Sequence, residues 1–217
     1  MKGCCSPAVL REIDFQLYLI TDRSLLGPGA TLPAAVGSAL KGGVRAVQLR
    51  EKDLGTRELL DMAYALRAIT REYSARLFVN GRVDVALAAG ADGVHLGSTD
   101  MPLPAARRAA GGSMLIGVST HSIQEARRAE EEGADFITLG PVYETPSKMR
   151  YGKPIGIRPL REVRKEVAIP VFAIGGITRE RVEEVVEAGA SGVALISAIL
   201  ASGDIKSSAE EFMRLLK

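Results

Sequence analysis

The feature that most limits how this chain can fold is a repeated alternation of short apolar runs with longer amphipathic stretches. Several runs, such as LYLI, VFAI and VALI, are apolar at consecutive positions. Continuous apolarity is typical of strands in a parallel sheet that is covered on both faces. The predicted strands are Leu17–Thr21, Ala46–Arg50, Leu77–Asn80, Gly93–Leu96, Leu115–Ser119, Phe136–Gly140, Pro170–Ile174 and Gly192–Ile196.

Most of the stretches between these runs have the hydrophobic period of an amphipathic helix. In the longest, Leu59, Ala63 and Leu66 fall on one stripe with charged residues opposite. Ser122, with Glu125 three residues later, has the pattern of a capping box. The predicted helices are Leu32–Lys41, Thr56–Tyr73, Val83–Ala88, Pro102–Ala109, Ser122–Glu132, Thr178–Ala188 and Ser208–Leu216.

Eight β/α units without a linker rich in proline, glycine or serine predict a single α/β domain, a (β/α)8 or TIM barrel, with residues 1–15 as an N-terminal extension and 16–217 as the barrel. An open, doubly wound sheet is the alternative. The two cysteines, Cys4 and Cys5, are adjacent in the extension and cannot staple a core. This cysteine usage favours a reducing, cytoplasmic location.

Charge and composition exclude several classes of partner. The 28 Lys and Arg against 26 Asp and Glu give a net charge of only +2, so general nucleic-acid binding is not expected. Tryptophan is absent and aromatic residues make up 5%, which leaves no platform for stacking single-stranded bases. No run of about 18 apolar residues occurs, so we expect no membrane span. Any anionic ligand must therefore be bound by a few local basic groups.

In a barrel of this kind, the chemistry lies at the carboxyl ends of the strands. The second strand ends in Gln48-Leu49-Arg50-Glu51-Lys52, and alternation directs Gln48, Arg50 and Lys52 the same way. Buried cations without partners are costly. Two cations at the mouth therefore predict an anionic ligand, unless Glu51 or Asp53 neutralises them.

Other polar side chains follow the next strands. Asn80 ends the third strand, Asp100 follows the fourth, and Ser119 and His121 follow the fifth. Asp100 offers oxygen ligands suited to Mg²⁺, or else it simply precedes a helix. For His95, between two apolar neighbours, we expect a buried structural group, whereas the role of His121 stays open.

Two loops near the end of the barrel also offer ligand-binding groups. The long segment after the sixth strand has no helical period, and Thr145, Ser147 and Lys148 in it suit a loop that closes over a ligand. Gly176 follows the seventh strand and Ser197 the eighth, where barrels commonly bind phosphate through backbone N–H groups. No nucleophile–base pair is evident, so charge stabilisation must carry the reaction. That suits the departure of a diphosphate.

Together these segments resemble the thiamine phosphate synthase family, to which the thiazole tautomerase is related. The resemblance runs from about Gln16 to Ile199, on VQLREK at 47–52, ADGVHLG at 91–97, GVSTHS at 117–122, GADFITLGPVYETPSK at 133–148, AIGGIT at 173–178 and ISAI at 196–199. It implies a Mg²⁺-dependent transferase that joins hydroxymethylpyrimidine diphosphate to a thiazole phosphate. The products would be thiamine phosphate and pyrophosphate, formed by a dissociative mechanism.

The resemblance also implies a role for each matching residue. The implied contacts to the pyrimidine diphosphate are Gln48, Leu49, Arg50, Glu51, Lys52, Asn80, Ser119 and Lys148. The implied contacts to the thiazole phosphate are Thr145, Pro146, Ser147, Gly176, Ile196 and Ser197, and His121 completes the substrate site. Arg50, Lys52, Ser119 and Lys148 are the expected catalytic residues, and Asp100 is the expected metal ligand.

One departure from the family pattern concerns the metal. The family has Asn-Asp before an arginine, with the aspartate as a Mg²⁺ ligand, whereas this chain has Asn80-Gly81. We therefore expect weakened metal binding, because Mg²⁺ tolerates one carboxylate supplemented by water and phosphate oxygens. The departure keeps two alternatives open: a thiazole tautomerase with His121 as acid/base, and a non-catalytic phosphate-binding regulator. The full set of diphosphate contacts favours the synthase, and a homodimer is compatible with the sequence.

Overall fold

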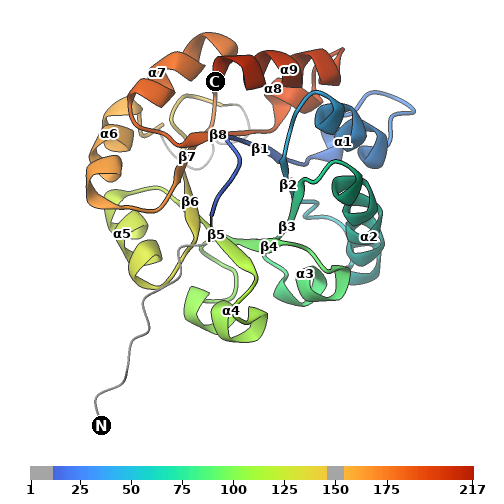
Figure 1. Ribbon diagram of the computed structural model, residues 1–217, viewed down its shortest axis with the longest axis horizontal. Coiled ribbons are helices and arrows are strands. Elements are labelled where there is room, and N and C mark those ends of the chain that lie inside the picture. Colours follow the sequence, from blue (N-terminus) through green and yellow to red (C-terminus); the bar gives the residue numbers. More distant parts are fainter. Residues whose placement is uncertain (1–11, 146–153) are drawn as a thin grey trace.

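The computed structural model describes residues 12–145 and 154–217, and it forms a closed barrel of eight parallel strands inside a ring of helices (Figure 1). Neighbouring strands in the barrel are neighbours in the sequence, and β8 closes the barrel by pairing with β1. The strands are β1 (Leu17–Ile20), β2 (Ala46–Leu49), β3 (Arg76–Asn80), β4 (Gly93–Leu96), β5 (Leu115–Thr120), β6 (Phe136–Leu139), β7 (Val171–Ile174) and β8 (Gly192–Leu195). The predicted (β/α)8 barrel is confirmed, and the open sheet is wrong.

Among the described residues, the predicted helices are present with changed ends, one of them is divided in two, and two unpredicted helices occur. The helices are α1 (Leu32–Lys41), α2 (Thr56–Glu72), α3 (Val83–Ala89), α4 (Leu103–Ala110), α5 (Ile123–Glu131), α6 (Ile157–Glu166), α7 (Val182–Glu187), α8 (Ser197–Leu200) and α9 (Ile205–Leu215). Short 3-10 turns lie at η1 (Arg23–Leu25) and η3 (Arg179–Arg181). The single helix expected from Thr178 is therefore divided into η3 and α7, and α6 and α8 were not predicted.

Side-chain caps set where several helices begin. The Ser122 hydroxyl accepts a hydrogen bond from the Glu125 N–H at 3.2 Å, as the capping-box pattern predicted. The Glu125 carboxylate returns to the backbone one residue earlier than expected, at the N–H of His121 (2.7 Å). Asp204 caps α9 by accepting from the Ser207 N–H at 3.0 Å, which explains why this helix begins before the predicted Ser208.

Inside the barrel, phenylalanine rings face glycines across neighbouring strands. Three register pairs have this arrangement: Phe78 with Gly93, Phe136 with Gly117, and Phe172 with Gly192. A Cβ at Gly93 would lie 2.4 Å from the Phe78 ring, and one at Gly117 would lie 2.4 Å from the Phe136 ring. The glycines therefore provide the volume that the rings fill, as dense packing of a barrel interior requires.

Aromatic rings close the amino-terminal end of the barrel. Phe15 is 6% exposed, and its ring centroid lies 5.1 Å from that of Phe172 and 5.7 Å from that of Phe136. Tyr18 on β1 packs edge-on against Phe78 and Phe136 in the same cluster. Phe15 thus belongs to the barrel interior although it falls in the predicted extension. Polar groups gather toward the opposite, carboxyl end.

Candidate active site

Buried polar side chains replace the aromatic rings as the strands approach their carboxyl ends. Gln48 on β2, His95 on β4 and Thr138 on β6 are each 1–2% exposed, whereas Ser119 on β5 is half-buried. Gln48 Nε2 donates to the Tyr18 hydroxyl at 3.1 Å, and His95 Nε2 lies 3.0 Å from Ser119 Oγ. Two predicted substrate contacts, Gln48 and Ser119, therefore belong to one polar layer beneath the barrel mouth.

His95 is the buried structural group that its apolar neighbours suggested. Burial, followed by the positive charge of Arg50, lowers the pKa of His95 from 6.5 to about 3. The imidazole is therefore neutral at physiological pH.

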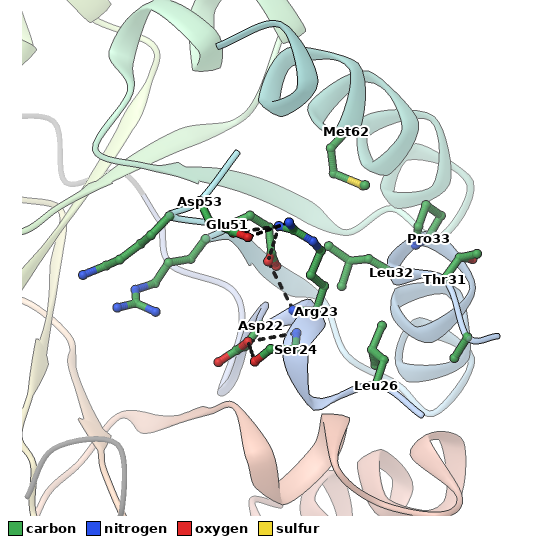
Figure 2. Close-up of a pocket in the computed structure, with 13 residues that line it drawn as sticks. Asp22, Arg23, Ser24, Leu26, Thr31, Leu32, Pro33, Glu51, Asp53 and Met62 are labelled. Atoms are coloured by element: carbon green, nitrogen blue, oxygen red, sulfur yellow. Dashed lines mark hydrogen bonds and ion pairs between the residues drawn. The ribbon is translucent and has the colours of Figure 1, made fainter. Parts of the chain in front are cut away.

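The two cations after β2, Arg50 and Lys52, are not neutralised by the carboxylates next to them in the sequence. Glu51 and Asp53, the partners considered from the sequence, pair with Arg23 instead (Figure 2). Arg23 donates to both Asp53 oxygens at 2.8 and 2.6 Å, and its Nη1 lies 3.4 Å from Glu51 Oε2. Within residues 12–145 and 154–217, neither Arg50 nor Lys52 forms an ion pair. The alternative, neutralisation of the two cations by Glu51 or Asp53, is therefore not found there, which leaves both cations for an anionic ligand.

A pocket of about 750 Å³ lies between the loop after β1 and the loop after β2 (Figure 2). Arg50 and Lys52 line it together with residues of η1 and α1. Glu51 also lines the pocket and is 7% exposed. Its Oε2 accepts the Arg23 N–H at 3.2 Å, while its buried Oε1 has no hydrogen-bond partner in the described part of the chain. A buried acceptor of this kind favours a ligand that brings an N–H or O–H donor.

The Asp100 carboxylate occupies the place where a side chain at position 81 would begin. A Cβ at Gly81 would lie 2.7 Å from Asp100 Oδ1, and Gly81 has a φ of +68°, a conformation that favours glycine. Asp100 Oδ2 accepts the Gly97 N–H at 2.7 Å. Among the described residues, no group of three or more His, Cys, Asp or Glu side chains could hold a metal. The donors fit a Mg²⁺ ion with one protein carboxylate and otherwise water and substrate oxygens.

His121 follows β5 and lies beside the end of β6. Its Nδ1 hydrogen-bonds the Gly140 carbonyl oxygen, which can only accept. Nδ1 therefore carries a hydrogen, and in the neutral ring Nε2 is an acceptor that has no hydrogen-bond partner among the described residues. The side chain is exposed at the carboxyl end of the barrel, where a proton exchange with a ligand is feasible.

The loop after β7 packs tightly against the segment after β6. A Cβ at Gly176, which has a φ of +64°, would lie 2.4 Å from the Glu144 carbonyl oxygen and 2.8 Å from Tyr143 Cβ. Arg181 donates to the Gly176 carbonyl at 2.6 Å and stacks on the Tyr143 ring at 4.3 Å. Glu184 accepts from the Tyr143 hydroxyl at 2.6 Å; burial and this contact raise the pKa of Tyr143 to about 12. We call Arg181 and the Tyr143 side chain the clamp, because together they hold the Gly176 peptide in place. No sequence pattern indicated it.

The remaining predicted residues divide into four groups. Asn80 ends β3, Ile196 follows β8, and the half-buried Thr145 follows β6, so all three are at the barrel mouth. Leu49 is fully buried in the apolar layer between strands and helices, so only its backbone is available to a ligand. Ser197 begins α8 and is exposed. Pro146, Ser147 and Lys148 lie outside the described residues.

A (β/α)8 barrel whose carboxyl end carries a glycine loop and two cations without ion-pair partners among the described residues has the features of enzymes that bind phosphorylated small molecules. The chain belongs to the thiamine monophosphate synthase family, whose model matches residues 17–199. The family predicted from the sequence is thus confirmed, and with it the enzyme class, a transferase of thiamine biosynthesis.

Individual relatives agree with this assignment. A protein from Geobacter sulfurreducens is 55% identical over 95% of this chain and 97% of its own length. The thiamine-phosphate synthase of Clostridium novyi is 44% identical, over 90% of this chain and 95% of its own. The solved thiamine phosphate pyrophosphorylase of Pyrococcus furiosus is 42% identical with a TM-score of 0.86, covering 93% of this chain and 95% of its own. In the described residues, no helix is both long and apolar enough to cross a membrane.

Proposed function

We propose that this protein is a thiamine-phosphate synthase that condenses 4-amino-2-methyl-5-hydroxymethylpyrimidine diphosphate with a thiazole phosphate. The observation that carries the proposal is the pair of cations, Arg50 and Lys52, which have no ion-pair partner in the described structure and line a pocket at the barrel mouth. The relatives' names support the same reaction. A cytoplasmic location is part of the same proposal, and a homodimer is compatible with it.

The pyrimidine diphosphate would lie over the ends of β2 to β5. Arg50, Lys52 and Lys148 would neutralise its phosphates, and Asn80 and Ser119 would donate hydrogen bonds to it. Gln48 lies in the buried polar layer below this surface, where its Nε2 donates to the Tyr18 hydroxyl. Glu51 Oε1, which has no partner within residues 12–145 and 154–217, offers an acceptor at the edge of the same pocket.

The thiazole phosphate would lie on the opposite side of the mouth, at the loops after β6, β7 and β8. Thr145, Pro146 and Ser147 would contact it from the first loop. The backbone at Gly176 and Ile196 and the hydroxyl of Ser197 would hold its phosphate. The clamp of Arg181 and Tyr143 supports this arrangement because it orients the Gly176 peptide.

The reaction needs charge stabilisation more than a protein nucleophile. As the bond between the pyrimidine methylene carbon and the diphosphate oxygen breaks, negative charge grows on the departing group, and Arg50, Lys52 and Lys148 would stabilise it. Asp100 would hold Mg²⁺, which supplies further charge neutralisation to a diphosphate when bound. The thiazole nitrogen would then capture the pyrimidine cation from the adjoining subsite.

The test is to incubate the purified protein with both substrates and Mg²⁺ and to follow thiamine phosphate and pyrophosphate by ³¹P NMR. Arg50→Ala is expected to lower turnover by at least about tenfold, because one stabilising charge is lost in the transition state. Arg128→Ala, on the exposed outer face of α5, is the matched control and should leave turnover unchanged. Near-normal coupling by Arg50→Ala would remove the diphosphate assignment.

A thiazole tautomerase is the second candidate, favoured by His121 Nε2 at the barrel mouth, which has no partner in the described part of the chain. His121→Ala separates the two functions. It is expected to abolish tautomerisation of the thiazole phosphate carboxylate, if that is the activity, and to lower coupling only slightly. A large loss of coupling alone would assign His121 to the synthase reaction instead.

A further inference from the structure

A chain of polar contacts crosses the barrel interior from β2 to β5. Gln48 Nε2 donates to the Tyr18 hydroxyl oxygen at 3.1 Å, and that hydroxyl lies 3.5 Å from His95 Nδ1. On the other side of the ring, His95 Nε2 lies 3.0 Å from Ser119 Oγ. Tyr18, Gln48 and His95 are at most 2% exposed, whereas Ser119 is half-buried, so this chain begins in the core and ends at the mouth.

The order of these groups determines where each hydrogen lies. The Tyr18 oxygen accepts from Gln48, so its own hydrogen is available for His95 Nδ1. A neutral imidazole that accepts at Nδ1 carries its only N–H at Nε2. That N–H then faces Ser119 Oγ, with Thr138 Oγ1 farther away at 3.5 Å.

We propose that His95 is a positioning residue that fixes the Ser119 hydroxyl as a hydrogen-bond donor toward the ligand. The inference rests on the proposed function, in which Ser119 contacts the diphosphate. Because Ser119 Oγ accepts from His95, its own hydrogen is directed away from the imidazole, toward the mouth. Phosphate oxygens only accept hydrogen bonds, so a hydroxyl held as a donor complements the ligand.

The opposite tautomer would reverse this effect. With the hydrogen on Nδ1, His95 Nε2 would accept from Ser119, and the serine would present lone pairs to an anion. Burial of the ring and the nearby Arg50 keep His95 uncharged, so both nitrogens cannot donate at once. The Tyr18 hydroxyl is therefore the group that selects between the two arrangements.

Imidazole NMR tests the tautomer directly. The chain contains only two histidines, so ¹⁵N-histidine labelling gives two rings to assign. We expect His95 to be the Nε2–H tautomer between about pH 5.5 and 8, and neutral His121, whose Nδ1 faces a carbonyl, to be the Nδ1–H tautomer. A charged His95, or one with its hydrogen on Nδ1, would overturn the inference.

A double-mutant cycle tests the consequence for turnover. Tyr18→Phe keeps the packed ring and removes the hydrogen that selects the tautomer, so we expect kcat to fall roughly tenfold, as for one lost hydrogen bond. In a Ser119→Ala background the same change should have little effect, because His95 acts through Ser119. Tyr64→Phe, on the exposed face of α2, is the control for removal of a tyrosine hydroxyl.

The outcomes separate this inference from the proposed function. Wild-type turnover in Tyr18→Phe, or equal losses in the presence and absence of Ser119, would refute the role of His95. Failure of the wild-type protein to couple the two substrates would refute the synthase assignment. The NMR result stands in that case, because it reports the tautomer in the absence of substrates.

Discussion

Replacing Gly81 by aspartate tests how the Asp100 carboxylate is held. The new Cβ would lie 2.7 Å from Asp100 Oδ1 and 2.9 Å from its Cγ, so Asp100 must move. That movement breaks the 2.7 Å hydrogen bond from the Gly97 N–H. Position 81 also has a φ of +68°, which L-residues adopt at a cost. The family pattern suggested that this substitution would simply restore a metal ligand, whereas the structure adds a local penalty.

The size of the penalty follows from two contributions. The left-handed backbone costs about 1–2 kcal/mol for a residue with a Cβ. Loss of a hydrogen bond to a charged acceptor costs about 1.5–3 kcal/mol. For a domain of this size we therefore expect the melting temperature of Gly81→Asp in EDTA to fall by on the order of 10 °C.

Thermal unfolding with and without Mg²⁺ is the assay. Gly81→Ala has the same strain and steric contact but brings no carboxylate, so it is the matched control. Mg²⁺ held between the introduced carboxylate and Asp100 would return about 2.7 kcal/mol at a concentration 100 times its Kd, and only in the aspartate variant. An unchanged melting temperature in EDTA would refute the packing argument. An identical Mg²⁺ response of both variants would place the metal elsewhere.

The clamp and the buried polar layer each give one further prediction. Arg181→Ala should raise the KM for the thiazole phosphate roughly tenfold, because the Gly176 carbonyl loses its 2.6 Å hydrogen bond from Arg181. The KM for the pyrimidine diphosphate should change less. Steady-state kinetics in which each substrate is varied in turn measures both values. The pKa of His95 is lowered from 6.5 to about 3 on folding, so below pH 6.5 the unfolded chain binds the extra proton. The free energy of unfolding should therefore fall as the pH decreases from 6.5 toward 3, by up to about 1.4 kcal/mol per pH unit. Urea unfolding at several pH values measures this dependence, and His95→Gln should lack the part that His95 contributes.

The fold could be predicted from the sequence because its signals are local. Consecutive apolar residues mark several of the strands, and Ser122 with Glu125 marks the start of α5. Helix α8 was missed because it has only four residues and follows β8 directly, which leaves no periodic pattern to detect. The division of the segment from Thr178 into η3 and α7 likewise has no counterpart in hydrophobic period.

The site was less predictable because its geometry depends on residues far apart in the chain. The position of Arg50 at the mouth followed from strand alternation, but the pairing of Arg23 with Asp53 joins loops 30 residues apart. The carboxylate of Asp100 fills the space at Gly81, and the sequence indicates only that a side chain is missing there. Such contacts depend on the closed barrel, so a linear pattern cannot contain them.

The phenylalanine–glycine pairs inside the barrel make its interior a shared volume between neighbouring strands. A larger residue at position 93 requires a smaller residue at position 78, because a Cβ at Gly93 and the Phe78 ring would occupy the same space. Tolerated changes should therefore come as matched exchanges: Gly93→Ala alone overfills the core, while Gly93→Ala with Phe78→Leu restores room. In a library that randomises these positions, surviving sequences should conserve the summed volume of each pair, whichever strand carries the larger residue.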